Sequence, residues 1–239
     1  MATLSRGRTC LARGKAYEQY IAANCLALYR HIDSSEPLVC QNECTAGAKH
    51  GCDIILHAHE QTYGLEIKND RATECGQRSL IVDRTRLTLP RDDQNIVHRR
   101  YLGSHIPFDG RIPSFMIAPR ATDAKTIWGR ESSVFRDEII AIESTTAIAE
   151  YYSSMGSDYI QIAGKGFYRT SADDPLNTVA PLLECGAHIR IRCKRHGSRG
   201  CLPRSVQVCF VLERKKLVDS PIDLDYPECI PQSFIKLSA

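Results

Sequence analysis

The chain lacks any apolar run approaching the length of about eighteen residues that is needed to cross a lipid bilayer. Its first residues, MATLSRGRTCLARGK, hold no apolar core followed by a cleavage site, so we expect no secretory signal. Internal repeats, low-complexity segments and linkers long enough to separate domains are also missing. We therefore expect one intracellular domain over residues 1–239, in the cytoplasm or in the nucleus of a eukaryote, without a membrane partner.

The chain also lacks a large excess of charge of either sign, whereas cysteine is plentiful. A net charge of +3 with 25% charged residues neither demands nor excludes a nucleic-acid partner, so the distribution of charge matters more. An apolar content of 43% is enough for a full core. The 11 cysteines are an odd number in a chain without a signal, which indicates reduced thiols rather than a disulfide framework.

Zinc is one alternative use for these cysteines, but the CxxC spacing of zinc knuckles is absent. Zinc would accept a first set that is close in sequence, and a second set recurs at even spacing. These sets are Cys40, Cys44, His50 and Cys52, and Cys185, Cys193, Cys201 and Cys209. Because Cys193 and Cys209 fall in expected strands, where free cysteine is a small core residue, structural Zn²⁺ is not the favoured interpretation.

The stretch GCDIILHAHEQTYGLEIK predicts two adjacent strands joined by a turn. Glu66 and Lys68 are two apart, so they point to the same face of a strand. If the turn centres near His59 and Glu60, antiparallel pairing places Asp53 opposite Glu66, with Cβ atoms about 4.5–5.5 Å apart. Two carboxylates and a lysine then converge among apolar neighbours, which is the pattern of a metal site.

Asp53 followed by Glu66-Ile67-Lys68 resembles the signature of the PD-(D/E)XK nuclease superfamily, which has the restriction-endonuclease-like fold. Upstream, GKAYEQYIAANCLALY reads as an amphipathic helix that contains Glu18. The superfamily often carries an acidic residue on such a first helix, facing the metal site. The resemblance implies an α/β fold with a central mixed β-sheet flanked by helices.

Two other acid-x-lysine triplets lack this context. Glu213 begins the triplet ERK after a good strand, but no acid lies at hairpin distance before it. Asp123 begins DAK within PRATDAKT, which reads as a loop. One departure from the family pattern is that Cys52, rather than proline, precedes Asp53, at a position known to vary.

The resemblance also implies a mechanism and a set of site residues. One or two Mg²⁺ ions would be bound by the carboxylates of Asp53, Glu66 and Glu18 and by the carbonyl of Ile67. Lys68 would orient the attacking water and stabilise the transition state as a fixed cation. Some members use a glutamine after the lysine, which makes Gln77 a candidate, although a surface amide is the favoured alternative for it.

The C-terminal stretch AHIRIRCKRHGSRGCLPRSVQVCFVLE predicts a basic β-hairpin. HIRIRC alternates apolar and charged residues, as a half-buried strand does, and SVQVCFVL is its expected partner. The residues expected to contact nucleic-acid phosphates are Arg190, Arg192, Lys194, Arg195, His196 and Arg199. The alternative is that these charges only protect a strand edge from aggregation. We place the nucleic-acid-contacting part at about 178–216 and the catalytic core at about 14–165.

Four further elements are expected from the pattern of apolar residues. EPLVCQNEC, residues 36–44, is a short strand candidate at the sheet edge. Residues 114–118 read as a buried strand, the fourth of the core sheet, and residues 158–163 as another strand. A helical segment is expected near 135–153.

The favoured function is a Mg²⁺-dependent endonuclease that hydrolyses double-stranded DNA. A sequence-specific, restriction-type enzyme ranks above a structure-selective or repair nuclease and above a junction resolvase. The resemblance implies that such an enzyme acts as a homodimer. Two alternatives remain open: a non-catalytic DNA-binding module on the same fold, and a zinc-stabilised interaction domain.

Overall fold

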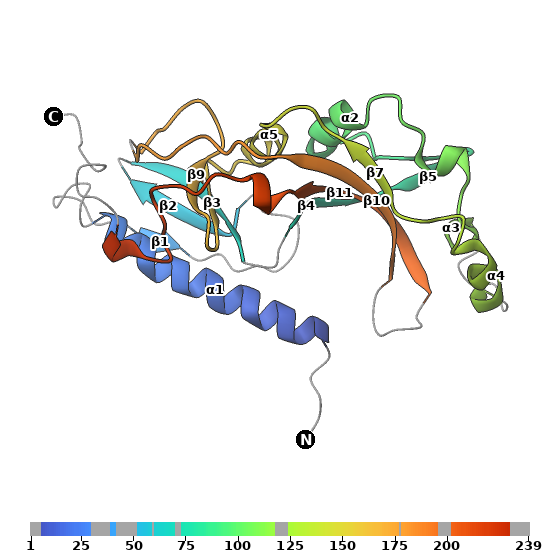
Figure 1. Cartoon of the computed structure of the whole chain (residues 1–239), viewed down its shortest axis with the longest axis horizontal. Coiled ribbons are helices and arrows are strands. Elements are labelled where there is room, and N and C mark those ends of the chain that lie inside the picture. The colour runs from blue at the N-terminus through green and yellow to red at the C-terminus, as the bar shows by residue number, and fades with distance from the viewer. Residues whose placement is uncertain are drawn as a thin grey trace, which may run out of the picture. The chain divides into compact units, whose positions relative to one another are not determined.

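The computed structural model shows a mixed α/β protein, which confirms the predicted class (Figure 1). The residues that the structure describes are 6–29, 39–41, 52–58, 60–69, 73–117, 124–176, 178–195 and 202–229. They form two compact units: the first draws on residues 1–73, 146–185 and 214–239, the second on 74–145 and 186–213. The chain passes from one unit to the other more than once. The single domain over 1–239 stays a prediction.

No helix within the described residues has the length and apolarity required to span a bilayer. The intracellular location stays a prediction.

A five-stranded mixed sheet forms the centre of the first unit, in the order β1-β2-β3-β8-β9. β1, β2 and β3 pair antiparallel, β8 pairs parallel with β3, and β9 pairs antiparallel with β8. The strands are β1 Val39–Gln41, β2 Ile54–Ala58, β3 Gln61–Lys68, β8 Tyr159–Ile162 and β9 Gly166–Arg169. The helices of this unit are α1 Arg6–Tyr29, α5 Ala147–Ser154, η3 Arg214–Lys216 and η4 Pro227–Cys229. β1 and β8 confirm the strands expected within residues 36–44 and 158–163.

The β2–β3 hairpin follows the predicted register. Ile54 pairs with Leu65 and Ala58 with Gln61, so the turn falls where it was expected. Glu60 adopts a positive φ of 61°, which is a left-handed conformation that a tight turn requires. Since one face of the hairpin is buried, a slip of one residue would turn its apolar side chains to the wrong side.

The core of the first unit lies against the apolar face of this hairpin. Ile54 and Leu65 are fully buried, and Ile21 of α1 packs in the same cluster. Tyr159 of β8 and Phe167 of β9 stack on each other, with ring centroids 5.0 Å apart. The expected helix with its apolar stripe is therefore the element that closes this core.

Gly64 fixes β3 against the segment that leads into β8. A Cβ atom at this position would lie 2.2 Å from the carbonyl oxygen of Gly156. The amide of Gly64 donates to Oδ2 of Asp158 at 2.8 Å, and the amide of Asp158 donates to the Gly64 carbonyl at 2.8 Å. Glycine is required here by the close approach of two backbones.

The second unit contains a four-stranded antiparallel sheet in the order β4-β11-β10-β7. A two-stranded sheet, β5–β6, and short helices complete the unit. The strands are β4 Glu74–Ser79, β5 Ile81–Asp83, β6 Arg86–Thr88, β7 Glu138–Ala141, β10 Ala187–Arg195 and β11 Pro203–Leu212. The helices are η1 Asp93–Asn95, α2 Ile96–Leu102, η2 Pro107–Gly110, α3 Ser114–Ile117 and α4 Ala124–Glu131. β10 and β11 run side by side over most of their length (Figure 1).

Two elements differ from the sequence-based expectation. The predicted fourth strand at 114–118 was wrong, because residues Ser114–Ile117 form helix α3 in the second unit. A short apolar run does not distinguish a strand from a helix, and here Ser114 donates from its amide and hydroxyl to Glu131 of α4. The helix expected over 135–153 is also wrong in its first half, which forms β7 paired with β10.

The Gly64→Ala substitution is expected to lower the free energy of unfolding by about 3 kcal/mol, because the new methyl group would collide with backbone atoms. Urea unfolding of the purified variant measures this loss. Gly129→Ala is the matched control, since nothing lies within 4 Å of a Cβ there, and alanine in helix α4 should be neutral or stabilising. Equal stability of the two variants would contradict the close-approach argument.

Candidate active site

Asp53 and Glu66 lie at the same end of the β2–β3 hairpin. The amide of Asp53 donates to the carbonyl of Leu65 at 3.1 Å, and Asp53 lies one register step beyond the Ile54–Leu65 pair. Its Oδ2 atom accepts a hydrogen bond from the amide of Ile67 at 2.8 Å. The structure therefore brings these two predicted acids together and fixes the orientation of the first.

Lys68 completes the set on the same face of β3. Its Nζ atom lies 2.5 Å from Oε1 of Glu66, and the two side chains are only 17% and 13% exposed. The ammonium group also lies 5.4 Å from the centroid of the Tyr152 ring, which α5 supplies. An aromatic ring at this distance attracts a cation through its negative face. Lys68 is thus held between a carboxylate and an aromatic ring.

Burial and like charge make Glu66 unusual among the carboxylates. Burial raises the pKa of Glu66, and the negative charges of Asp53 and Glu18 raise it further. The nearby Lys68 acts in the opposite direction but does not cancel the rise. Glu18, on the half-buried part of α1, is therefore close enough to act electrostatically on the site. Glu66 thus lies within electrostatic reach of two other acids and one lysine.

The donor set at this site fits a hard divalent cation. The carboxylates of Asp53, Glu66 and Glu18, with the Ile67 carbonyl, offer oxygen atoms, which Mg²⁺ prefers. A second positive charge would offset the mutual repulsion that raises the pKa of Glu66. Over the described residues, no group of three or more His, Cys, Asp or Glu side chains is arranged as a metal cluster. The acids at this site therefore offer suitable ligand atoms but do not form a preformed metal cluster.

Cys52 is the described cysteine nearest to these acids. Burial and the charges of Glu66 and Asp53 raise the pKa of its thiol to about 11. Zinc binds the thiolate, so binding at Cys52 would have to displace this proton. Of the other members of the first proposed zinc set, Cys44 and His50 lie outside the described residues, as does the side chain of Cys40.

The described members of the second proposed zinc set are divided between the two units, with Cys185 in the first and Cys193 and Cys209 in the second. Cys185 and Cys209 are buried, Cys193 is half-buried, and all three are free thiols. Burial raises the pKa of Cys193 to about 12 and that of Cys209 to about 11. Cys201 lies outside the described residues.

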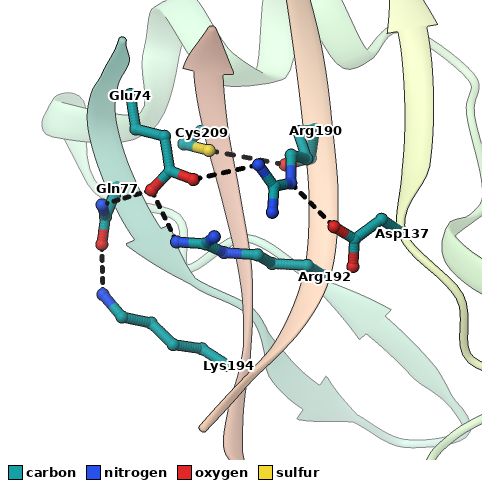
Figure 2. A network of polar contacts seen from close by, with 7 residues as sticks. All are labelled: Glu74, Gln77, Asp137, Arg190, Arg192, Lys194 and Cys209. Carbon is teal, nitrogen blue, oxygen red and sulfur yellow. Dashed lines mark hydrogen bonds and ion pairs between the residues drawn. The ribbon is translucent and has the colours of Figure 1, made fainter. Parts of the chain in front are cut away.

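Gln77 and the basic residues belong to the second unit. Gln77 lies on β4, where its amide contacts Glu74 and Lys194 (Figure 2). Arg190 and Arg192 of β10 form ion pairs with carboxylates on the same sheet. The remaining predicted contacts fall outside the described side chains: Arg195, His196 and Arg199.

Three residues that shape these sites were not predicted from the sequence. Tyr152 contacts Lys68 from a helix far along the chain, and Glu74 and Asp137 pair with the arginines of β10. No local pattern marks any of them. The signal that could have found Glu74 and Asp137 is the density of cations on β10, which demands anionic partners when the strand is partly buried.

The Glu66→Gln substitution should flatten the pH dependence of stability in EDTA. In the wild type, the folded state holds the Glu66 proton more tightly than the unfolded state, so stability is highest below the ordinary glutamate pKa and falls as pH rises through the raised pKa. Thermal unfolding between pH 4 and pH 8 measures the slope. Glu60→Gln, at an exposed turn position, should keep the wild-type slope. An unchanged slope in Glu66→Gln would contradict the assigned burial.

Comparison with known proteins adds no relative to this chain. No family model matches it, and no curated protein or solved structure matches it either.

Proposed function

We propose that this chain is a Mg²⁺-dependent endonuclease that hydrolyses phosphodiester bonds of double-stranded DNA. The observation that carries the proposal is the half-buried convergence of Asp53, Glu66 and Lys68 at one end of the hairpin. Burying two like charges side by side is costly, and a catalytic metal site gives a reason for it. A surface hairpin with an ordinary ion pair would leave these side chains exposed.

The surroundings of the site support the restriction-endonuclease-like fold as part of this proposal. The acids and the lysine belong to a mixed sheet, and a first helix contributes Glu18, as the resemblance implies. β8 runs parallel to β3 and places Ile160 and Ile162 beside Glu66 and Lys68. Both isoleucines are buried, so the floor of the site is apolar.

In the proposed hydrolysis, Asp53, Glu66 and Lys68 have different roles. When bound, Mg²⁺ supplies an activated water and neutralises charge that develops at phosphorus. Asp53 and Glu66 would hold the ion, and the amide of Ile67 orients Asp53. Lys68 leaves Glu66 and turns its ammonium group to the attacking water and the transition-state oxygens.

Specificity and assembly follow from the resemblance. A sequence-specific, restriction-type enzyme acting as a homodimer is the preferred form, ahead of a repair nuclease or junction resolvase. A non-catalytic DNA-binding module is a second candidate, favoured by one observation: the 2.5 Å contact between Lys68 and Glu66 occupies both groups.

Lys68→Ala is expected to lower the cleavage rate about 100-fold or more while DNA binding is retained, because a fixed cation at the transition state is removed. The assay is incubation of plasmid DNA with Mg²⁺ or EDTA. Lys125→Ala is the matched control, since this exposed lysine ends another acid-x-lysine triplet, DAK, outside the predicted nucleic-acid-contacting part. Unchanged cleavage by Lys68→Ala would sink the assignment.

The pattern of products separates the remaining forms of the proposal. Discrete bands that require both Mg²⁺ and Lys68 are expected of a sequence-specific enzyme. Smearing or nicking would instead indicate a repair or structure-selective nuclease. Binding without cleavage would favour the non-catalytic module.

A further inference from the structure

The sheet of the second unit has one apolar and one polar face. Along β10, Ile189 and Ile191 are fully buried, whereas Arg190, Arg192 and Lys194 alternate with them and remain partly exposed. Since side chains alternate across a strand, the three cations form a row on one face. Arg190 lies where β10 is flanked by both β11 and β7, whereas Arg192 and Lys194 lie beyond the pairing with β7, which ends at Ile191. Protection of an edge therefore does not explain the charge at Arg190.

A single carboxylate joins two members of this row. Oε1 of Glu74 lies 3.2 Å from Nη1 of Arg190, and Oε2 lies 2.5 Å from Nη2 of Arg192. Figure 2 shows Glu74 reaching from β4 across the strand that carries Cys209. Cys209 faces Arg190 in the β10–β11 register, and its small side chain lets the charged groups meet above it. One carboxylate thus bridges two guanidinium groups.

Two further contacts order the row. Gln77 donates to Oε2 of Glu74 at 2.8 Å and accepts a hydrogen bond from Lys194. Arg190 also donates from Nε to Oδ2 of Asp137 at 2.8 Å. Three cations face two carboxylates, which leaves one positive charge over the network. The arginines are therefore held in fixed positions and only partly neutralised.

We propose that this row binds the phosphate backbone of DNA, and that the Glu74 carboxylate occupies the place of a phosphate between Arg190 and Arg192 in the free protein. Carboxylate and phosphate oxygens accept the same paired donors from guanidinium groups, so one can replace the other. Glu74 is the first residue of β4, and its rotation away breaks no strand pairing. The inference rests on the proposed function in taking DNA as the ligand.

Exchange of Glu74 for a phosphate explains how partly buried arginines could still bind DNA. Arg192 and Glu74 are each 19% exposed, so neither pays a full desolvation cost when the pair forms. A phosphate that enters as Glu74 leaves keeps both guanidinium groups hydrogen-bonded. Glu74 then acts as an internal competitor that lowers affinity for the backbone of DNA.

The test is fluorescence anisotropy of a labelled DNA duplex with the full chain in EDTA, over a range of NaCl concentrations. Glu74→Gln is expected to bind roughly 8-fold tighter at 0.1 M salt, because one more phosphate contact is formed without competition. Arg192→Gln is expected to bind roughly 8-fold more weakly, with the slope of log affinity against log salt reduced by about 0.9. Arg86→Gln removes the same charge from exposed β6 and should bind like the parent.

A structural clamp between β4 and β10 would give a different result. Glu74→Gln would then melt at a lower temperature and bind DNA no more tightly than the parent, which would overturn the proposal. Arg192→Lys keeps the charge but not the paired donors, so an affinity between those of parent and Arg192→Gln is expected even if the glutamine variant folds poorly. If the protein cleaves DNA but the variants do not change DNA affinity as expected, only the role of Glu74 and the arginines is refuted. If the affinities change as expected but no Mg²⁺-dependent cleavage occurs, only the nuclease activity is refuted.

Discussion

The register between β2 and β3 is the constraint on which the candidate site depends. It aligns Asp53 with Glu66, and the alternation of β3 then puts Lys68 on the same face. The buried face of the hairpin and the backbone contact at Gly64 hold that register. A slip by one residue would separate the acids and expose the core together, so the stability of the fold and the geometry of the site are set by the same contacts.

Ionisation of Glu66 in the folded state is opposed by its surroundings. Glu66 is buried beside other acids, and its raised pKa records the cost of keeping it ionised. The apolar neighbours Ile160 and Ile162 increase that cost by excluding water. Buried charges of this kind are common at functional sites, where binding of an ion or substrate can offset the free-energy cost of burying them. The burial of like charges distinguishes the Asp53–Glu66–Lys68 set from an exposed ion pair.

Short-range patterns predicted the parts of the fold that obey local rules. The hairpin register follows from strand alternation and a tight turn, and α1 follows from its apolar spacing. The sequence could not divide the chain into two units, because each unit joins segments that are distant along the chain. The apolar run at 114–118 satisfies both helix and strand, and only its contact with Glu131 decides between them. Long-range pairing likewise hid the roles of Tyr152 and Glu74.

In both candidate sites, a functional cation is paired with a carboxylate of the same chain. Lys68 is paired with Glu66, and Arg190 and Arg192 are paired with Glu74, in each case with a carboxylate of the chain itself. Removing one partner of a partly buried pair leaves an unpaired charge and is destabilising, whereas exchange for another ion keeps the remaining charge paired. Under the proposed function, Glu66 would exchange Lys68 for a bound Mg²⁺, and Arg190 and Arg192 would exchange Glu74 for a DNA phosphate. The pairs therefore keep both sites ordered before substrate arrives, and they set affinity by how readily each carboxylate changes partners.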